Sequence, residues 1–246
     1  MQTKQRSSSR GAAKLLEDLR SDLASQDTDA NRRNYQRFFK ERLAEPVGLS
    51  TAVLRKISNR RFREYRQLPV QDILGLCDAL LASRERYSRF FAFDWADKLK
   101  GKYHKSDLTR FHGWLMKYVD NWGTCDHVCS PLGHFFCQYP DLSSRLIPWT
   151  RSQNRWCRRA AAVSLTVAAK KGELIDRILE IADRLYDDPD DLVQQGCGWM
   201  LKEASGKHQG PIFDYVMSKR DTMPRTTLRY AIEKMPTGLR RRAMAP

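Results

Sequence analysis

The stretch that decides the fold is residues 159–169, Arg-Ala-Ala-Ala-Val-Ser-Leu-Thr-Val-Ala-Ala. Its side chains are small and mostly apolar, with no alternation of polar and apolar positions, so we expect one helix buried on several sides. Lys170, Lys171 and Gly172 follow it, and basic residues with a glycine are typical of the end of a helix. The stretch therefore predicts a helix enclosed by other helices.

Helical periodicity continues on both sides of this stretch, and β-type alternation is nearly absent. One expected helix, residues 72–81, opens just after Pro69, and proline is favoured at the first turn of a helix. A second, residues 174–186, is amphipathic and is closed by Asp187-Asp188-Pro189. The series continues over residues 192–204, 212–217 and 226–235.

The expected helices are joined by short polar, proline or glycine segments, as is usual between packed helices. Successive helix pairs recur at roughly 35–45 residues, the spacing of HEAT-like units. We predict an all-α protein: an α-solenoid of HEAT-like helical repeats, forming a single domain over residues 12–240 and presenting a long concave surface. A flexible polar N-terminal tail, residues 1–11, and a C-terminal tail, residues 241–246, complete the chain. A compact all-α domain is the alternative.

Composition points to a polyanionic partner. The 246 residues carry 44 Lys and Arg against 29 Asp and Glu, a formal net charge of +15. This balance favours nucleic acid over an anionic membrane surface, and a solvated basic face is the plain alternative. The chain has no apolar run of the ~18–20 residues that span a membrane, and its polar start does not resemble a secretory signal. We expect a concave basic face that binds DNA, with no membrane partner.

Trp122 and Asp126 form the first candidate site. They lie four residues apart, so on a helix they share one face. Asn121 or Thr124 could cap that helix, which leaves Asp126 without a capping role. An aromatic ring beside a carboxylate in a basic chain suggests a site for a cation held on DNA. Both residues could instead be structural, since tryptophan is usually buried and an aspartate near a helix start often serves as a cap.

Arg159 and Trp199 are the next candidates. Arg159 follows Trp156 in the pattern W-x-x-R and is placed at the start of the apolar stretch, where a phosphate could be bound bidentately. A cation at a helix start is mildly unfavourable, which argues for a functional role. Trp199 follows Gly198, and Gly196 lies one position before Cys197. Glycines within a helix cost about 1 kcal/mol each against alanine and often permit close approach of a neighbour. Packing remains the alternative role for Trp199.

A cluster of Cys and His residues follows Trp122 and must be weighed as a metal site. Its spacings match no compact zinc finger, and Pro131-Leu132-Gly133 is expected to interrupt the run. We favour buried or half-buried reduced thiols and expect no metal, which also fits a cytoplasmic protein. The cluster does not match the deaminase pattern, and no nucleotide-binding loop is found elsewhere. Its members are Cys125, His127, Cys129, His134 and Cys137.

Further basic residues could touch phosphates from helix starts or loops, although none can be assigned to a base. They are Arg32-Arg33, Arg55-Lys56, Arg60-Arg61, Arg63, Arg66, Arg158-Arg159 and Arg240-Arg241-Arg242.

In this order and on this helical background, the motifs resemble the AlkD family of HEAT-repeat DNA glycosylases. The resemblance runs from about Asn31 to Met235. Residues 47–56, Val-Gly-Leu-Ser-Thr-Ala-Val-Leu-Arg-Lys, are similar to the family's glycine-containing turn and following helix. Glu85-Arg86-Tyr87 and Asp94-Trp95 resemble the next repeat. The W-x-x-x-D, W-x-x-R and G-W motifs match the family's catalytic cleft, each short by itself but specific in combination.

Two departures from the family are visible. The family often has two adjacent tryptophans and an extra aspartate, where this chain has Asn121 and Gly123. Its N-terminal aromatic, commonly tyrosine, is replaced by Phe38 or Phe39, so a hydroxyl contact is not expected there. Asp126, which the resemblance implies is the essential carboxylate, is kept, and this implies an active member.

The resemblance implies a monofunctional glycosylase that removes cationic purines such as 3-methyladenine and 7-methylguanine from double-stranded DNA. Asp126, Trp122 and Trp199 are then the catalytic residues. Arg159 would hold a backbone phosphate, and further DNA contacts would come from Arg158, Phe38, Arg55 and Lys56. No metal or organic cofactor is implied, a monomer is the simplest state, and DNA binding would associate the protein with the nucleoid. The alternatives are a non-catalytic HEAT-repeat DNA-binding or scaffold protein and a protein–protein adaptor.

Overall fold

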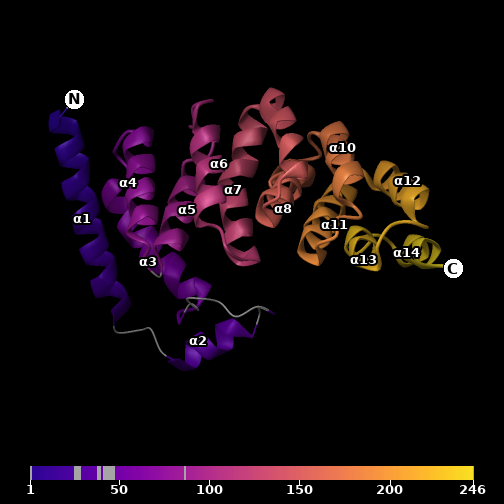
Figure 1. The fold of residues 1–246 in the computed structure, drawn as a ribbon, viewed down its shortest axis with the longest axis horizontal. Helices are drawn as coiled ribbons and strands as arrows, with labels where there is room; N and C mark the ends of the chain where they lie inside the picture. The colour runs from indigo at the N-terminus through magenta and orange to yellow at the C-terminus, as the bar shows by residue number, and fades with distance from the viewer. Residues whose placement is uncertain (1, 25–28, 38–39, 41–47, 86, 246) are drawn as a thin grey trace. The chain divides into compact units, whose positions relative to one another are not determined.

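The computed structural model describes residues 2–24, 29–37, 40, 48–85 and 87–245 (Figure 1). It divides into two compact units, Met1–Lys102 and Tyr103–Pro246, named unit 1 and unit 2 below. Helices and turns make up the described residues, and no strand occurs among them. The predicted all-α class is therefore confirmed. Residues 12–240 were expected to form a single domain, whereas the contacts within the chain group into these two units.

Unit 1 contains five helices among its described residues: α1 (Gln2–Ala24), α2 (Asp29–Gln36), α3 (Thr51–Tyr65), α4 (Val70–Ser83) and α5 (Ser88–Lys98). Helix α4 packs against α1 and α5, and α3 also packs against α5. Helix α4 opens just after Pro69, as the sequence predicts, although Pro69 is its N-cap residue and not part of its first turn. Arg61 ties α3 to α1, because its Nε donates to Asp22 Oδ2 at 2.7 Å and its Nη2 donates to Asp22 Oδ1 at 2.9 Å.

Unit 2 is a stack of helices that follow one another in chain order (Figure 1). Helix α7 packs against α6, α8 and α9; α11 packs against α8, α9, α10, α12 and α13; and α12 packs against α14. Consecutive stacking of this kind is what an α-solenoid requires. Its elements are α6 (Asp107–Tyr118), α7 (Trp122–Gln138), η1 (Pro140–Leu146), η2 (Pro148–Arg151), α8 (Arg155–Val163), α9 (Thr166–Lys171), α10 (Ile175–Leu185), α11 (Asp191–Ser205), α12 (Gln209–Lys219), α13 (Arg225–Ala231) and α14 (Thr237–Met244).

The stretch 159–169 is buried as predicted, but it is not one helix. Helix α8 ends at Val163 and α9 begins at Thr166. The Thr166 hydroxyl donates to the Val163 carbonyl at 2.8 Å, and side-chain bonds of this kind compete with helical backbone bonds and bend helices. The end of the stretch agrees with the prediction: Gly172 caps α9 with a left-handed φ of 80°.

Three other expectations are corrected. Helix α1 begins at Gln2, so the segment assigned to a flexible N-terminal tail is helical, and α14 extends to Met244 within the assigned C-terminal tail. Pro131 does not interrupt its run but lies inside α7. Close packing accompanies this proline: a Cβ built at Gly133 would lie 2.6 Å from Val167 Cγ2, so α7 and α9 are in close contact there.

None of the helices in the described part of the chain combines the length and the apolar character needed to cross a bilayer.

Candidate active site in unit 2

Helix α7 carries the first part of the site. Asn121 is its N-cap residue, and its Oδ1 accepts a hydrogen bond from the Thr124 backbone N–H at 2.9 Å. Trp122 is the first helical residue and is half-buried, and Asp126 lies one turn further along the same face. Because Asn121 supplies the cap, Asp126 has no capping role, as the sequence predicts.

Asp126 is paired with Arg159 of α8 in a bidentate ion pair. Arg159 Nε donates to Asp126 Oδ1 at 2.8 Å, and Arg159 Nη2 donates to Asp126 Oδ2 at 2.9 Å. The remaining terminal nitrogen of Arg159, Nη1, donates to the Leu192 carbonyl at the start of α11. The side chain of Arg159 is 6% exposed and that of Asp126 is 19% exposed. The carboxylate therefore keeps a limited opening to solvent, while the guanidinium is enclosed.

This geometry changes the expected role of Arg159. Arg159 was expected at a helix start, where it would bind a phosphate. Helix α8 begins four residues earlier, at Arg155, and is capped by Asn154, whose Oδ1 accepts from the Trp156 backbone N–H at 2.9 Å. Arg159 therefore lies one turn inside α8, and the helix dipole gives no reason to expect a functional role for it. Its partner in the structure is a carboxylate, so its direct effect is to orient Asp126.

Helix α11 completes the surroundings of the pair through its two glycines. A Cβ built at Gly196 would lie 3.2 Å from Arg159 Cγ, so this glycine makes room for the Arg159 side chain. A Cβ built at Gly198 would lie 2.5 Å from Tyr230 Cβ, so that glycine brings α13 close to α11. The prediction that these glycines permit close approach is confirmed.

Trp199 is half-buried on α11, three residues after Gly196. Its indole Nε1 donates to Glu203 Oε1 at 2.9 Å, and Lys234 Nζ donates to Glu203 Oε2 at 2.6 Å. Lys170 Nζ lies 5.9 Å from the centroid of the Trp199 ring, in cation–π range. The indole is thus fixed at its edge by a buried carboxylate, and its π system already attracts a cation.

The electrostatics of the two carboxylates differ. Burial raises the pKa of Asp126 above its ordinary value, and the hydrogen bonds and charge of Arg159 oppose that rise. Burial lowers the pKa of Arg159, but the bonds to Asp126 outweigh this effect and the pKa is raised. For Glu203, burial raises the pKa, but the bonds from Lys234 and Trp199 bring it below its usual range. Glu203 is therefore held in its ionised form, and at Asp126 the bonds from Arg159 favour the carboxylate against the effect of burial.

The other predicted DNA contacts have different surroundings. Arg158 Nε donates to Asp188 Oδ2 at 2.7 Å and Arg158 Nη2 donates to Asp188 Oδ1 at 3.1 Å, so this arginine is held in a second ion pair. Arg55 and Lys56 are exposed on α3, in unit 1. Phe38 lies outside the described residues.

The six cysteines are all free thiols, five of them buried and Cys137 half-buried, as expected for structural thiols. Burial raises the pKa of Cys137 and of Cys157 to about 11. Among the described residues, no group of three or more His, Cys, Asp or Glu side chains is placed to hold a metal ion.

Sequence reasoning missed three residues of this site: Lys170, Glu203 and Lys234. The position of Glu203, four residues after Trp199, carries the same signal that singled out Trp122 and Asp126, so it could have been found. Lys170 was assigned only to the end of a helix. No local pattern links Lys234 to Trp199, because their connection depends on how α13 packs against α11.

Fold and site together define an all-α protein in which a partly open carboxylate, oriented by an enclosed arginine, shares its helix face with one half-buried indole. A second indole follows on a helix that contacts the same arginine. The family model described as DNA alkylation repair enzyme matches residues 19–235. The chain therefore belongs to the DNA alkylation repair enzyme family, and its role lies in DNA repair.

A solved structure supports the fold. It is described as a predicted DNA alkylation repair enzyme from Enterococcus faecalis and superposes with a TM-score of 0.75 at 14% sequence identity. The match covers 86% of this chain and 98% of that one. At this identity the likeness shows a common fold. Among the curated proteins compared, none matches the chain.

Proposed function

We propose that the protein is a monofunctional DNA glycosylase that hydrolyses the N-glycosidic bond of cationic alkylated purines in double-stranded DNA. Family membership supports a repair enzyme acting on alkylated DNA. The site supports the substrate class, because a carboxylate and two indoles favour positive charge. Purines alkylated at ring nitrogen 3 or 7, such as 3-methyladenine and 7-methylguanine, carry that charge.

The proposed reaction needs little machinery beyond this site. When the glycosidic bond breaks, its electron pair goes to the cationic base, which leaves as a neutral molecule without a general acid. The positive charge moves to the sugar, which becomes an oxocarbenium-like cation. Water then adds to the sugar carbon and releases a proton. The step to be stabilised is the formation of the sugar cation.

Asp126 is the residue proposed to stabilise that cation and to orient the water. Its carboxylate is 19% exposed and held by two bonds from Arg159, so it is oriented before the substrate binds. A charge placed in advance costs no reorganisation during the reaction, and removing such a group commonly costs ~10²–10³-fold in rate. Trp122 and Trp199 would flank the sugar and the lesion with their π faces, each contact being worth about 2 kcal/mol when desolvated.

The single observation that carries the proposal is the Asp126–Arg159 pair on the same helix face as Trp122. Its test is the release of 7-methylguanine from methylated duplex DNA under single-turnover conditions. Asp126→Asn is expected to lose at least ~10²-fold in rate. Its affinity for DNA should stay equal or rise, because a negative charge near phosphates is removed. The abasic strand should remain intact until it is treated with alkali.

Asp188→Asn is the matched control, since it breaks the bidentate pair made by the neighbouring arginine, Arg158. This variant should keep excision within about threefold of wild type per folded molecule. Equal losses in the two variants would mean that breaking a buried pair, not losing the catalytic charge, explains the effect. Wild-type excision by Asp126→Asn would exclude Asp126 as the catalytic group.

A non-catalytic DNA-binding protein is the second candidate function, and one observation favours it. Both oxygens of Asp126 already accept bonds from Arg159, as in a purely structural ion pair. This candidate predicts that wild-type protein binds duplex DNA with a strong salt dependence and releases no base above the spontaneous rate. We further propose that the protein acts as a monomer in the cytoplasm, associated with the nucleoid through DNA, and uses no metal or organic cofactor.

A further inference from the structure

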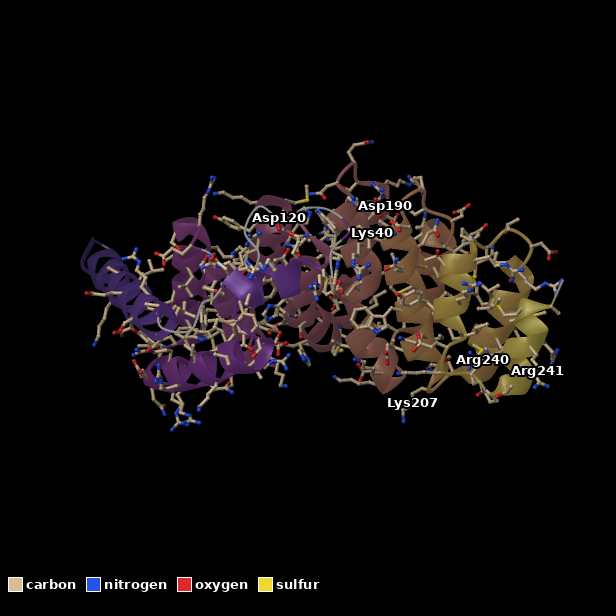
Figure 2. All side chains as sticks on the ribbon, turned by 90° about the horizontal axis from the view of Figure 1, so that it is seen from below. Lys40, Asp120, Asp190, Lys207, Arg240 and Arg241 are labelled. Carbon is tan, nitrogen blue, oxygen red and sulfur yellow. The ribbon has the colours of Figure 1, made fainter. Side chains whose placement is uncertain are left out.

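The C-terminal end of unit 2 contains a basic cavity that the candidate site does not use. It has a volume of about 480 Å³, and its lining combines three arginines with a hydroxyl and two apolar side chains. The lining residues are Arg229 of α13, Ile232, and Thr237, Arg240, Arg241 and Met244 of α14. Figure 2 shows the labelled Arg240 and Arg241 near each other at the yellow end of the ribbon.

Neighbouring contacts fix α14 so that these arginines remain outside. Ala243 is fully buried, Arg242 lies 5.0 Å over the Phe213 ring of α12, and Arg225 Nη1 reaches Met244 Sδ at 3.8 Å. These contacts come from the last turn of the short helix. Arg240 and Arg241 are both exposed. Their guanidinium groups are therefore available to a ligand without unfolding α14.

This region carries an excess of positive charge, although Lys234 is paired with Glu203. Residues 225–246 contain six basic residues and one acidic residue, Glu233. Elsewhere in unit 2 several exposed or half-buried cations are paired with carboxylates, for example Arg155 with Asp190 and Arg184 with Glu180. Within the described residues, no ion pair is found for the three arginines of the cavity. Like charges gathered without counter-charges repel one another, and an anionic partner relieves that repulsion.

We propose that this cavity is a second DNA contact, which holds phosphates of the duplex backbone away from the lesion. Arginine suits this role because its planar fork matches phosphate oxygens. The cavity is connected to the candidate site through packing: α13 carries Arg229 and lies against α11 at Gly198, next to Trp199. The proposal rests on the DNA-binding part of the proposed function and is independent of base excision.

The experiment measures the affinity of the full chain for an unmodified DNA duplex by fluorescence anisotropy over a series of KCl concentrations. The test variant is Arg229→Gln/Arg240→Gln/Arg241→Gln. Each phosphate contact contributes about 0.9 to the slope of log K against log salt concentration. We expect the slope to fall in magnitude by about 2–3 and the affinity near 0.1 M salt to fall by about ten- to a hundredfold. All three positions are exposed, and circular dichroism would verify the fold.

The matched control is Arg184→Gln/Lys219→Gln/Arg220→Gln, which removes the same charge from unit 2 at residues already paired with Glu180, Asp183 and Asp221. Its slope should change by less than about 1. An unchanged slope in the test variant, or an equal change in both variants, overturns the proposal. The proposal is also overturned if the test variant loses binding to vesicles of anionic phospholipid while the salt slope of its DNA binding is unchanged.

The excision rate at saturating methylated DNA separates this proposal from the proposed function. The test variant should retain it, because the cavity lies outside the candidate site. If wild-type protein excises nothing, the proposed function fails while the salt slope still decides the DNA contact. If the saturated rate falls in the test variant with no change in slope, the cavity belongs to the reaction and not to phosphate binding.

Discussion

Two neighbouring arginines of α8 form bidentate pairs with two different aspartates, and the pairs differ in what surrounds the carboxylate. Arg158 binds Asp188, whose side chain is 5% exposed. Asp188 Oδ1 also accepts from the Asp190 backbone N–H at 3.0 Å, and Arg158 Nη1 donates to the Ser152 carbonyl at 2.9 Å. This pair is enclosed in a network that joins the loops before α8 and α11.

In the pair of Arg159 and Asp126 the relative exposure of the two groups is reversed. Here the guanidinium is the enclosed group, and the carboxylate is 19% exposed. Asp126 lies one turn from Trp122, whereas Asp188 is in a turn between helices. Chemically identical pairs can therefore serve different ends: one stabilises loops, and the other presents an oriented charge. Ion-pair geometry alone does not distinguish the two pairs, whereas the exposure of the carboxylate and its one-turn spacing from Trp122 do.

The largest effects are expected when either arginine is removed. Arg158→Leu leaves the buried Asp188 without its partner, and Arg159→Leu does the same to the partly open Asp126. Breaking such a pair typically costs about 3–5 kcal/mol of unfolding free energy. Urea unfolding should show losses of similar size. Only Arg159→Leu should also lose excision per folded molecule, because only it releases Asp126. Equal excision in the two variants would break the distinction between the pairs.

The helix framework could be predicted from the sequence because it depends on local signals. Pro69 before α4, Gly172 after α9 and the apolar residues of 159–169 each act within a few positions. The errors arose where packing outweighs local preference. Pro131 lies inside α7, where Gly133 lets α9 approach, and α8 and α9 separate where the Thr166 hydroxyl takes a backbone carbonyl.

The candidate site was predictable as a set of residues but not as a set of contacts. Trp122 and Asp126 are linked by their four-residue spacing, which any helix converts into a shared face. The partner of Arg159 could not be derived, because Asp126 is 33 residues away in the chain. Asp188 was named only as part of a helix stop, although it fixes Arg158. Long-range pairing of charges depends on tertiary structure, and no periodicity in the sequence encodes it.

A smaller change should disturb one pair and spare the other. Gly196→Ala would place a Cβ 3.2 Å from both Arg159 Cγ and Val163 Cγ2, so Arg159 must shift by a few tenths of an ångström. Excision should fall several-fold through the misplacement of Asp126. The usual gain of about 0.5–1 kcal/mol for glycine to alanine in a helix should be mostly cancelled.

Gly113→Ala provides the control, since a Cβ at this helical position meets nothing within 4 Å. It should gain about 0.5–1 kcal/mol in thermal or urea unfolding and leave excision unchanged. If Gly196→Ala gained as much stability as Gly113→Ala at full activity, the contact between α11 and Arg159 would not constrain the site.

The smallest effect near neutrality, and the finest test of the comparison, is the pH dependence of excision. Burial raises the pKa of Asp126, and the active form in our proposal is the carboxylate. Activity should therefore be complete above this raised pKa and lost as the pH falls through it, by about tenfold per unit below it. Single-turnover rates, corrected for spontaneous depurination, would give a midpoint above the ordinary value of 3.8 for a free aspartate. Asp188→Asn should keep the same acidic limb, since the Arg158 pair lies outside the reaction. If Asp188→Asn shifted the midpoint of the acidic side of the pH–rate profile, the loss of activity at low pH could not be assigned to Asp126.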